Sequence, residues 1–573
     1  MNSCPGYTSR ITSDIFPYQR LFNKTLMVFN QLNLFASCKK NVNRHLFLIF
    51  CLIATSGWSQ IALEADPFAA SFFAQNITQE ELKEQLTRIA SEEFEGRETG
   101  SPGLEKAAQY LMSRLNDIGV ERHPNLKGYY QDVGFSYVQW EKLSIELNGQ
   151  KYEHLKDFLC FKEQNANLPK LNIKDVIYCG YGIDDPVYSD YRRANLRGKI
   201  IMIYPGEPLK KDSTSYITGS RELSDWAHNL DRKLAVAADK KVRVVLVVDP
   251  NLRTNISTNR PQVMAQTLHF APVAAPSVPN TIYISPDMAK AIIGEKEKTF
   301  VKNRIKLMQT GMSRPLHLPV DMSLSQHLTR NAMYSKNLLG VIPGIDPALK
   351  NEFVVLSAHY DHLGKRGKFI YPGADDNASG TAAVLEIMET IVEAKKQGQG
   401  PKRSVMCIFF TAEEKGLLGS KYYALHPVVP FSNTVVNVNI DMIGRTDSPH
   451  EKDPHYIYVI GSDRLSTDLH QINEATNEAF TFLNLDYTYN AKNDPNRFYY
   501  RSDHYNFAKE GVPSIFFFSG VHSDYHQPGD TVGKILFEKY QAVTKHIFHT
   551  VWELANRQER IRVDVVDDTI YNR

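Results

Sequence analysis

Short apolar runs of strand length alternate with amphipathic segments of helix length between residues 337 and 557 of this 573-residue chain. The apolar runs cover residues 337–342, 353–358, 405–410, 435–440, 456–460 and 513–518, and the helical segments cover about 379–394, 416–426, 466–479 and 537–557. Continuous apolar runs are typical of strands buried on both faces, and intervening helices allow successive strands to run parallel. The pattern predicts an α/β fold with a mixed, mainly parallel central sheet and helices on both faces.

Side chains that can bind metal follow several of these apolar runs, and one more lies in a turn that opens onto a helix. They are, in chain order, His359, Asp376, Glu413, Glu414, Asp441 and His526. Each has an ordinary explanation when taken alone, such as a charged strand exit or a loop histidine. Reactive groups collect beyond the carboxyl ends of the strands in such sheets, so their recurrence there favours one shared site. Three acids and two imidazoles suit two Zn²⁺ ions that share a carboxylate, and the extra glutamate suits a general base, so a hydrolase is predicted.

The spacing around His359 predicts how its ring is held. Residues i and i+2 share a side of an extended chain, so Asp361 can accept the second ring N–H of His359. Its neighbour His362 has no such support and is expected to be an ordinary histidine.

Spacing alone leaves other choices open. Asp375 and Asp376 are adjacent, as are Glu413 and Glu414, and the pattern does not say which member of either pair binds metal. Two histidines compete in the loop after residues 513–518, where His522 is less favoured than His526.

Bulk properties exclude some classes of function. The chain is 42% hydrophobic and 23% charged, as soluble globular proteins are, and its net charge of +2 gives no basis for nucleic-acid binding. Lys39, Lys40 and Arg44 precede a short apolar run and then small residues, which predicts an N-terminal extension and signal peptide over residues 1–59. The run is too short for a confident membrane span. We therefore expect an exported protein, periplasmic or extracellular, with no stable transmembrane anchor in the mature chain.

The remaining chain divides into three predicted parts. Residues 66–165 are expected to be the N-terminal part of the catalytic domain, with Thr78 and Glu81 forming a capping box. Residues 166–320 carry strand-like runs without a cluster of metal-binding residues, which indicates an inserted domain. Residues 330–560 are expected to form the main part of the catalytic domain.

Five ordered segments together resemble the motif set of the co-catalytic dizinc aminopeptidases of clan MH. They are residues 359–362, 373–380, 412–416, 439–444 and 525–531. Residues 94–103 match as well, and residues 166–320 resemble a protease-associated domain. The resemblance implies a zinc-exopeptidase fold and a metallo-aminopeptidase that acts on peptides with a free N-terminus.

The resemblance also implies a role for each site residue. It gives one Zn²⁺ to His359 and Asp441 and the other to Glu414 and His526, with Asp376 bridging both and a cis peptide after Asp376. Glu413 becomes the general base for a zinc-bound hydroxide, and Asp361 orients His359. A further segment is expected to wall the substrate pocket, through Tyr499, Tyr500, Arg501, Asp503 and His504.

Other activities occur on the same scaffold. A glutaminyl cyclase works with one zinc and lacks the full ligand set, whereas all five positions are present here. A carboxypeptidase for acidic C-terminal residues needs an arginine cluster, and no obvious one lies near these motifs. A dipeptidase of the same clan is a further alternative. An inactive binding protein with this fold would have lost ligands.

Overall fold

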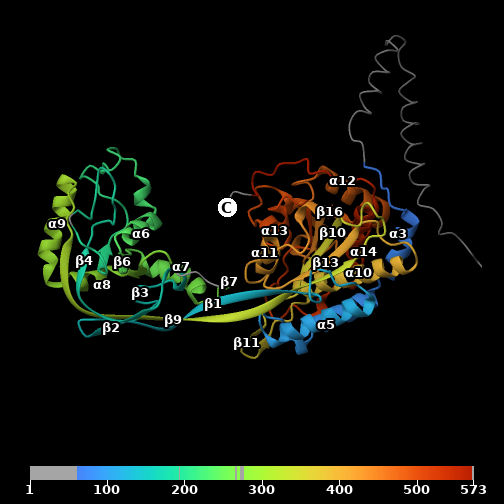
Figure 1. Cartoon of the computed structure of the whole chain (residues 1–573), viewed down its shortest axis with the longest axis horizontal. Coiled ribbons are helices and arrows are strands. Elements are labelled where there is room, and N and C mark those ends of the chain that lie inside the picture. Colours follow the sequence, from blue (N-terminus) through green and yellow to red (C-terminus); the bar gives the residue numbers. More distant parts are fainter. Residues whose placement is uncertain (1–60, 193, 265–266, 272–275, 571–573) are drawn as a thin grey trace, which may run out of the picture. The chain divides into compact units, whose positions relative to one another are not determined.

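Four parallel strands form the centre of the sheet that carries the site, in the order β17-β14-β10-β13 in this computed structural model. Figure 1 labels β10 and β13 among them. Their bounds are β10 (Phe353–His359), β13 (Ser404–Phe410), β14 (Thr434–Ile440) and β17 (Ser514–Phe518). Every residue of β13, β14 and β17 is buried, as the continuous apolar runs predict. The sheet continues through β15 (Tyr456–Ile460), which is antiparallel to β17, and β16 (Asn484–Asp486). The mixed, mainly parallel sheet predicted from the sequence is confirmed.

The structure describes residues 61–570, apart from 193, 265–266 and 272–275. The predicted signal peptide within residues 1–59 lies outside the described residues. All elements below belong to the unit Ala62–Arg573. No helix in the described ranges is long and apolar enough to cross a membrane.

Helices cover both faces of the sheet, because side chains along each strand alternate between the two faces. On one face Met406, Ile408 and Phe410 of β13 pack with Tyr423 and Phe507. Those two aromatics lie on α11 (Leu418–Leu425) and α13 (His504–Ala508). The other face is covered by α5 (Pro102–Ile118), α10 (Gly380–Lys396) and α14 (Phe537–Asn556), and α4 (Gln79–Ile89) packs on α10 and α14. The predicted segment 466–479 contains α12 (Thr467–Thr476), so the four predicted helices are present with bounds that differ by a few residues.

The helix α4 begins as the sequence predicts. The Thr78 hydroxyl accepts a hydrogen bond from the Glu81 backbone N–H at 3.2 Å and caps the helix. The same hydroxyl donates to the Glu81 carboxylate at 2.8 Å. The Glu81 side chain therefore returns to the capping hydroxyl, and the backbone N–H of the cap is not its partner.

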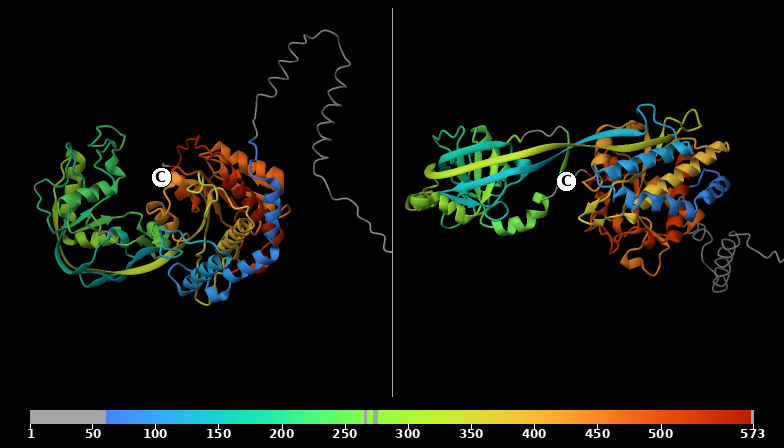
Figure 2. Two further views of the ribbon diagram at one scale, coloured as in Figure 1. Left: turned by 45° about the vertical axis from the view of Figure 1, so that its right-hand side comes forward. Right: turned by 90° about the horizontal axis from the view of Figure 1, so that it is seen from below.

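The strand β9 (Leu316–Ile342) is much longer than the predicted run 337–342 and takes part in several pairings. Residues 338–342 pair with β13, residues 322–338 with β1 (Tyr130–Leu147), and residues 316–326 with β4 (Leu168–Tyr178). Figure 2 shows β1 and β9 running side by side. The predicted boundary between residues 320 and 330 thus falls inside a continuous strand.

Beyond β9 the sheet continues through parallel strands with a core of their own. They are β4, β5 (Ile200–Ile203), β6 (Val244–Val248) and β8 (Asn280–Ile284). Met202, Leu246 and Ile282 pack there with Met322 and Leu324 of β9. The helices of this region are α6 (Leu230–Asp239), α7 (Leu252–Met264), α8 (Pro286–Ile293) and α9 (Glu297–Thr310).

Candidate metal centre

The ends of three neighbouring parallel strands place acids and a histidine at one edge of the sheet. His359 is the last residue of β10, Asp441 directly follows β14, and Glu413 and Glu414 follow β13. Parallel strands end on the same side, so these side chains converge although 82 positions separate His359 from Asp441. Asp376 reaches the same edge from the turn Ala374–Ser379 that leads into α10.

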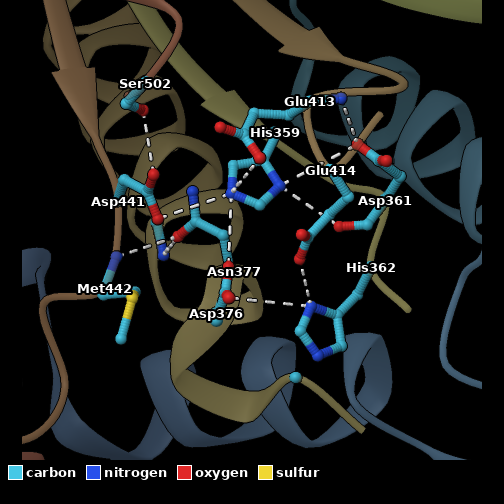
Figure 3. A network of polar contacts seen from close by, with 12 residues as sticks. His359, Asp361, His362, Asp376, Asn377, Glu413, Glu414, Asp441, Met442 and Ser502 are labelled. Atoms are coloured by element: carbon cyan, nitrogen blue, oxygen red, sulfur yellow. Dashed lines mark hydrogen bonds and ion pairs between the residues drawn. The ribbon is translucent and has the colours of Figure 1, made fainter. Parts of the chain in front are cut away.

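The first group of donor atoms surrounds the Nε2 atom of His359 (Figure 3). This nitrogen lies 3.4 Å from Asp376 Oδ1, 3.4 Å from Asp441 Oδ1 and 3.9 Å from Glu413 Oε2. All four side chains are largely buried, with His359 1% exposed. A histidine nitrogen therefore faces three carboxylates in a largely buried site.

The second group surrounds His526. Its Nε2 atom lies 3.2 Å from Asp376 Oδ2 and 3.2 Å from Glu414 Oε2. The two oxygens of Asp376 thus face different groups, Oδ1 towards His359 and Oδ2 towards His526. The peptide bond Asp376–Asn377 is cis, as the resemblance implies.

His362 differs from the expectation that it is an ordinary histidine. It is fully buried, and its Nδ1 atom lies 2.7 Å from Glu414 Oε1 and 3.8 Å from Asp376 Oδ2. Its backbone N–H donates to the Arg97 carbonyl at 3.0 Å. Sequence spacing does not predict this contact, because His362 and Glu414 come together only through the pairing of β10 with β13.

The residues present fit metal ions. Donor atoms of His359, Glu413 and Asp441 all lie within 4.8 Å of one another, and so do those of His362, Asp376 and Glu414. The Oδ1 atom of Asp441 is buried and has no hydrogen-bond partner. A buried carboxylate oxygen without a partner is costly, and a cation at this position would satisfy it.

Asp361 holds the neighbouring residues in a way that the spacing only partly predicts. The nearer acceptor for His359 Nδ1 is the Asp361 carbonyl oxygen at 3.2 Å, while the carboxylate oxygen is 3.9 Å away. The carboxylate instead accepts the Glu413 backbone N–H at 3.0 Å and the Thr99 hydroxyl at 2.9 Å. Asp361 therefore positions both His359 and the backbone of Glu413.

Further polar contacts, which were not singled out from the sequence, hold the ligand loops. Ser502 donates to Asp441 Oδ2 at 2.8 Å, and the Asp530 carboxylate accepts the backbone N–H groups of Asp375 and Asp376. The buried Arg97 donates to the carbonyl oxygens of Ile89, Tyr360, Pro372 and Gly373 at 2.7–3.0 Å. Arg97 lies in the segment 94–103 that matched the motif set, and that match was the available signal for it.

Burial and mutual charge shift the pKa values at the site. Burial raises the pKa of Glu413 well above its ordinary value, and the negative charges of Glu414 and Asp441 add to this. Burial opposes the charged form of His359, but the carboxylates of Glu413 and Asp441 outweigh it and raise its pKa. Glu414 is also buried, yet hydrogen bonds from His362 and His526 lower its pKa to about 2. The site as a whole therefore stabilises positive charge.

A cavity opens beside the two groups, and apolar side chains form part of its wall. The side chains that line it besides the acids and histidines are Met442, Phe498, Arg501, Phe516, Phe518, Val521 and Tyr525. Of the predicted pocket residues, Arg501 lies in this wall. Tyr499, Tyr500, Asp503 and His504 lie in the same segment, all four buried, but they do not line the cavity. The His504 ring stacks behind the wall on Phe516, with ring centroids 4.8 Å apart.

Comparison with known proteins agrees with this geometry. Residues 337–551 match the model of peptidase family M28. Aminopeptidase YwaD of Bacillus subtilis is 28% identical over 216 residues, which are 36% of this chain and 42% of that protein. A probable leucine aminopeptidase of Arthroderma otae is 30% identical over 221 residues, 37% of this chain and 57% of that protein. This chain therefore matches about half the length of these relatives.

A similar solved structure is the aminopeptidase from Aneurinibacillus sp. strain AM-1. It covers 87% of this chain and 98% of its own, with a TM-score of 0.48 and 18% identity. All the donor residues described above lie within the family match. The part of the chain that carries this site, residues 337–551, is therefore similar to peptidase family M28.

Proposed function

We propose that this protein is a zinc-dependent aminopeptidase, an exopeptidase that removes N-terminal residues from peptides with a free N-terminus. The observation that carries the proposal is the pair of donor groups that share Asp376, with Glu413 beside them. Carboxylate and imidazole donors in a closed site suit zinc, and three protein ligands leave room for water or substrate. The aminopeptidase names of the relatives also support it.

The proposed ligands follow the two groups. His359 and Asp441 would hold one ion, Glu414 and His526 the other, and Asp376 would contact both through its two oxygens. His362 would hold the remaining oxygen of Glu414 and so fix the orientation of that ligand. When bound, the ions would activate water and polarise the scissile carbonyl group.

Glu413 has the position of a general base. Its carboxylate lies beside the first group, and the Asp361 carboxylate holds its backbone N–H. Burial raises the pKa of its carboxyl group, and a base of raised pKa can take a proton from the attacking water and pass it to the leaving amine. The apolar wall of the cavity would receive the side chain of the first residue.

Hydrolysis of aminoacyl p-nitroanilides by the purified, zinc-loaded protein tests the function. We expect release of p-nitroaniline from leucine p-nitroanilide, and none from its N-acetylated form, because the blocked amine cannot bind. Cyclisation of N-terminal glutamine peptides without hydrolysis would support a cyclase instead. Equal turnover of free and acetylated substrates would exclude an aminopeptidase.

We also propose that the protein is exported and that residues 166–320 form an inserted domain like the protease-associated domain. The basic and apolar pattern before residue 60 supports export. The apolar cluster that includes Met202, Leu246 and Ile282 supports a separate core. Expression of the full chain in a bacterium and N-terminal sequencing of the exported product tests the first point, with cleavage expected near residue 59.

A further inference from the structure

Arg501 is the only arginine or lysine among the described residues that line the catalytic cavity. It follows the short helix Phe498–Tyr500, and its side chain is exposed at the protein surface. The apolar lining residues Met442, Phe516 and Phe518 are 2–4% exposed. The cavity therefore combines a buried apolar wall with one positive charge that solvent reaches.

The Arg501 head is held in place by aromatic rings. Its guanidinium carbon lies 4.8 Å from the centroid of the Phe498 ring, and Nη2 donates to the Tyr525 hydroxyl at 3.4 Å. A guanidinium that stacks on a ring keeps the N–H edges of its planar fork free to bind a carboxylate. The stacking also reduces the entropy lost when such a contact forms.

No carboxylate in the described part of the chain pairs with this guanidinium. Two other arginines of the same region have acidic partners: Arg445 lies 2.8 Å from Asp524, and Arg464 lies 2.9 Å from Asp567. The hydrogen-bonding edges of Arg501 are therefore available to a group that enters the cavity.

We propose that Arg501 binds a carboxylate of the peptide substrate and gives the enzyme a preference for substrates that carry one. This rests on the proposed aminopeptidase function and names a substrate class for it. A peptide substrate can supply this carboxylate in two ways, through the free C-terminus of a dipeptide or through an acidic side chain of its first residue. The buried wall is apolar, so an acidic side chain would lose its hydration there, which favours the dipeptide C-terminus.

The test compares dipeptides with and without a terminal charge. The ratio of kcat/KM for Leu-Gly to that for Leu-Gly-amide is measured in the wild type and in Arg501→Gln. We expect the wild type to favour the free acid by roughly tenfold and the variant to show a ratio near one. The change should lie mainly in KM, because the contact exists before and during reaction. High salt should reduce the wild-type ratio, since the guanidinium is exposed.

A second pair of substrates identifies the source of the carboxylate. If Glu-Gly-amide is favoured over Gln-Gly-amide in the wild type and not in Arg501→Gln, the carboxylate role stands and belongs to the first side chain. The matched control is Arg497→Gln, because Arg497 stacks on Tyr500 at 5.0 Å but does not line the cavity. That variant should keep both wild-type ratios.

Binding gives a readout that does not depend on turnover. Calorimetric titration of zinc-loaded Glu413→Gln with Leu-Gly and Leu-Gly-amide should show tighter binding of the acid, and the added Arg501→Gln change should abolish the difference. Failure of the wild type to hydrolyse either peptide would overturn the aminopeptidase function, while the binding difference would still decide the role of Arg501. The proposal would be overturned if Arg501→Gln kept the wild-type preference for the carboxylate in both substrate pairs and in binding. It would also be overturned if the wild type showed no such preference.

Discussion

Glu413 and Glu414 are neighbours in the chain, yet their carboxylates have different surroundings. Glu414 lies between His362 and His526, which stabilise its charged form. Glu413 lies near His359 and near the carboxylates of Glu414 and Asp441. Successive residues at a strand exit point in different directions, so one short segment supplies two groups with opposite protonation preferences. Both carboxylates are buried, but only Glu414 accepts hydrogen bonds from two histidines, and this sets the difference between the two pKa values.

Replacement of Glu413 by Gln should leave the metal ions bound and reduce kcat by about 10³-fold, since general-base groups contribute about 10²–10⁴-fold. Metal content by atomic absorption and kcat on leucine p-nitroanilide check this. The matched change Glu414→Gln should lose metal as well as activity. Loss of metal from Glu413→Gln would mean that the roles of the two glutamates are exchanged.

Glu386 on α10 provides a pH-dependent effect on stability away from the site. It is 3% exposed, and burial together with the charges of Glu81 and Glu389 raises its pKa from 4.5 to about 9. The folded state therefore holds a proton that the unfolded state releases above pH 4.5, so stability falls as the pH rises from about 4.5 to 9.

Glu386→Gln should remove that dependence and stabilise the protein at pH 8 more than at pH 5. Urea unfolding of both proteins at the two pH values measures it. The variant Glu389→Gln serves as a comparison, with a smaller effect expected because the Glu389 carboxylate is half-buried and pairs with Arg114. An equal effect of Glu386→Gln at both pH values would contradict the assignment.

The residues that the sequence identified are those whose chemistry follows a local pattern. Apolar runs located strand ends, and the acids and histidines next to them became candidates. His362, Ser502 and Asp530 were not found because each acts through a contact with a residue 50 or more positions away. Such contacts depend on strand order, and apolar periodicity does not reveal strand order.

At the scale of elements, α11 and the exit of β13 are fixed against each other by Gly419 and Asn337. The Asn337 side chain on β9 donates to the Gly419 carbonyl at 2.9 Å and accepts the Thr411 N–H at 3.2 Å. A Cβ atom on Gly419 would lie 2.1 Å from the Thr411 carbonyl oxygen. This contact sets the distance between the helix and the strand exit that carries Glu413 and Glu414.

Gly419→Ala should destabilise the fold by about 1–3 kcal/mol, although alanine favours helix by about 1 kcal/mol. The steric clash outweighs the gain in helix propensity because it involves the Thr411 backbone, which moves only with the whole strand exit. The unfolding temperature should decrease, and kcat/KM should decrease as well because the strand exit that carries Glu413 and Glu414 is displaced. Thermal unfolding and kinetic assays measure the two effects. Gly533→Ala is the control, since nothing lies within 4 Å of its added Cβ. A stability equal to or above the wild type would contradict the packing argument.

The sequence predicted most elements well because their patterns are local and continuous. It missed most of β9, although residues 316–324 alternate apolar and polar side chains, which is the pattern of a strand with one face in solvent. Residues 325–336 are mostly polar, so apolar periodicity does not indicate a strand there. The length of β9 arises from its pairing with β1 and β4, and those partners are distant in the chain.

At the scale of the molecule, Arg97 joins segments that are far apart in sequence. Its guanidinium donates hydrogen bonds to the carbonyl oxygens of Pro372 and Gly373, just before the turn that carries Asp376. It also donates to the carbonyl oxygens of Tyr360, next to His359, and of Ile89, at the end of α4. The N-terminal part therefore completes the metal site without supplying a ligand. The Arg97 charge is fully buried, and its nearest charged groups include Asp376 and Asp361.

Removal of metal should affect the whole fold. The acids of the site repel one another without cations, so chelation by EDTA or 1,10-phenanthroline should abolish activity and lower the unfolding temperature by several degrees. Scanning calorimetry before and after chelation measures this, and added Zn²⁺ should restore both properties. Full activity after exhaustive chelation would contradict the proposed metal dependence.

The continuous strand β9 also bears on how this protein tolerates truncation. Its backbone N–H and C=O groups are divided between partners on both sides, from β4 at its start to β13 at its end. Excision of residues 166–320 would expose an open strand edge on β9 and β1, and such edges recruit other chains into aggregates. Evolution could therefore lengthen or reshape the loops of this region more easily than delete it.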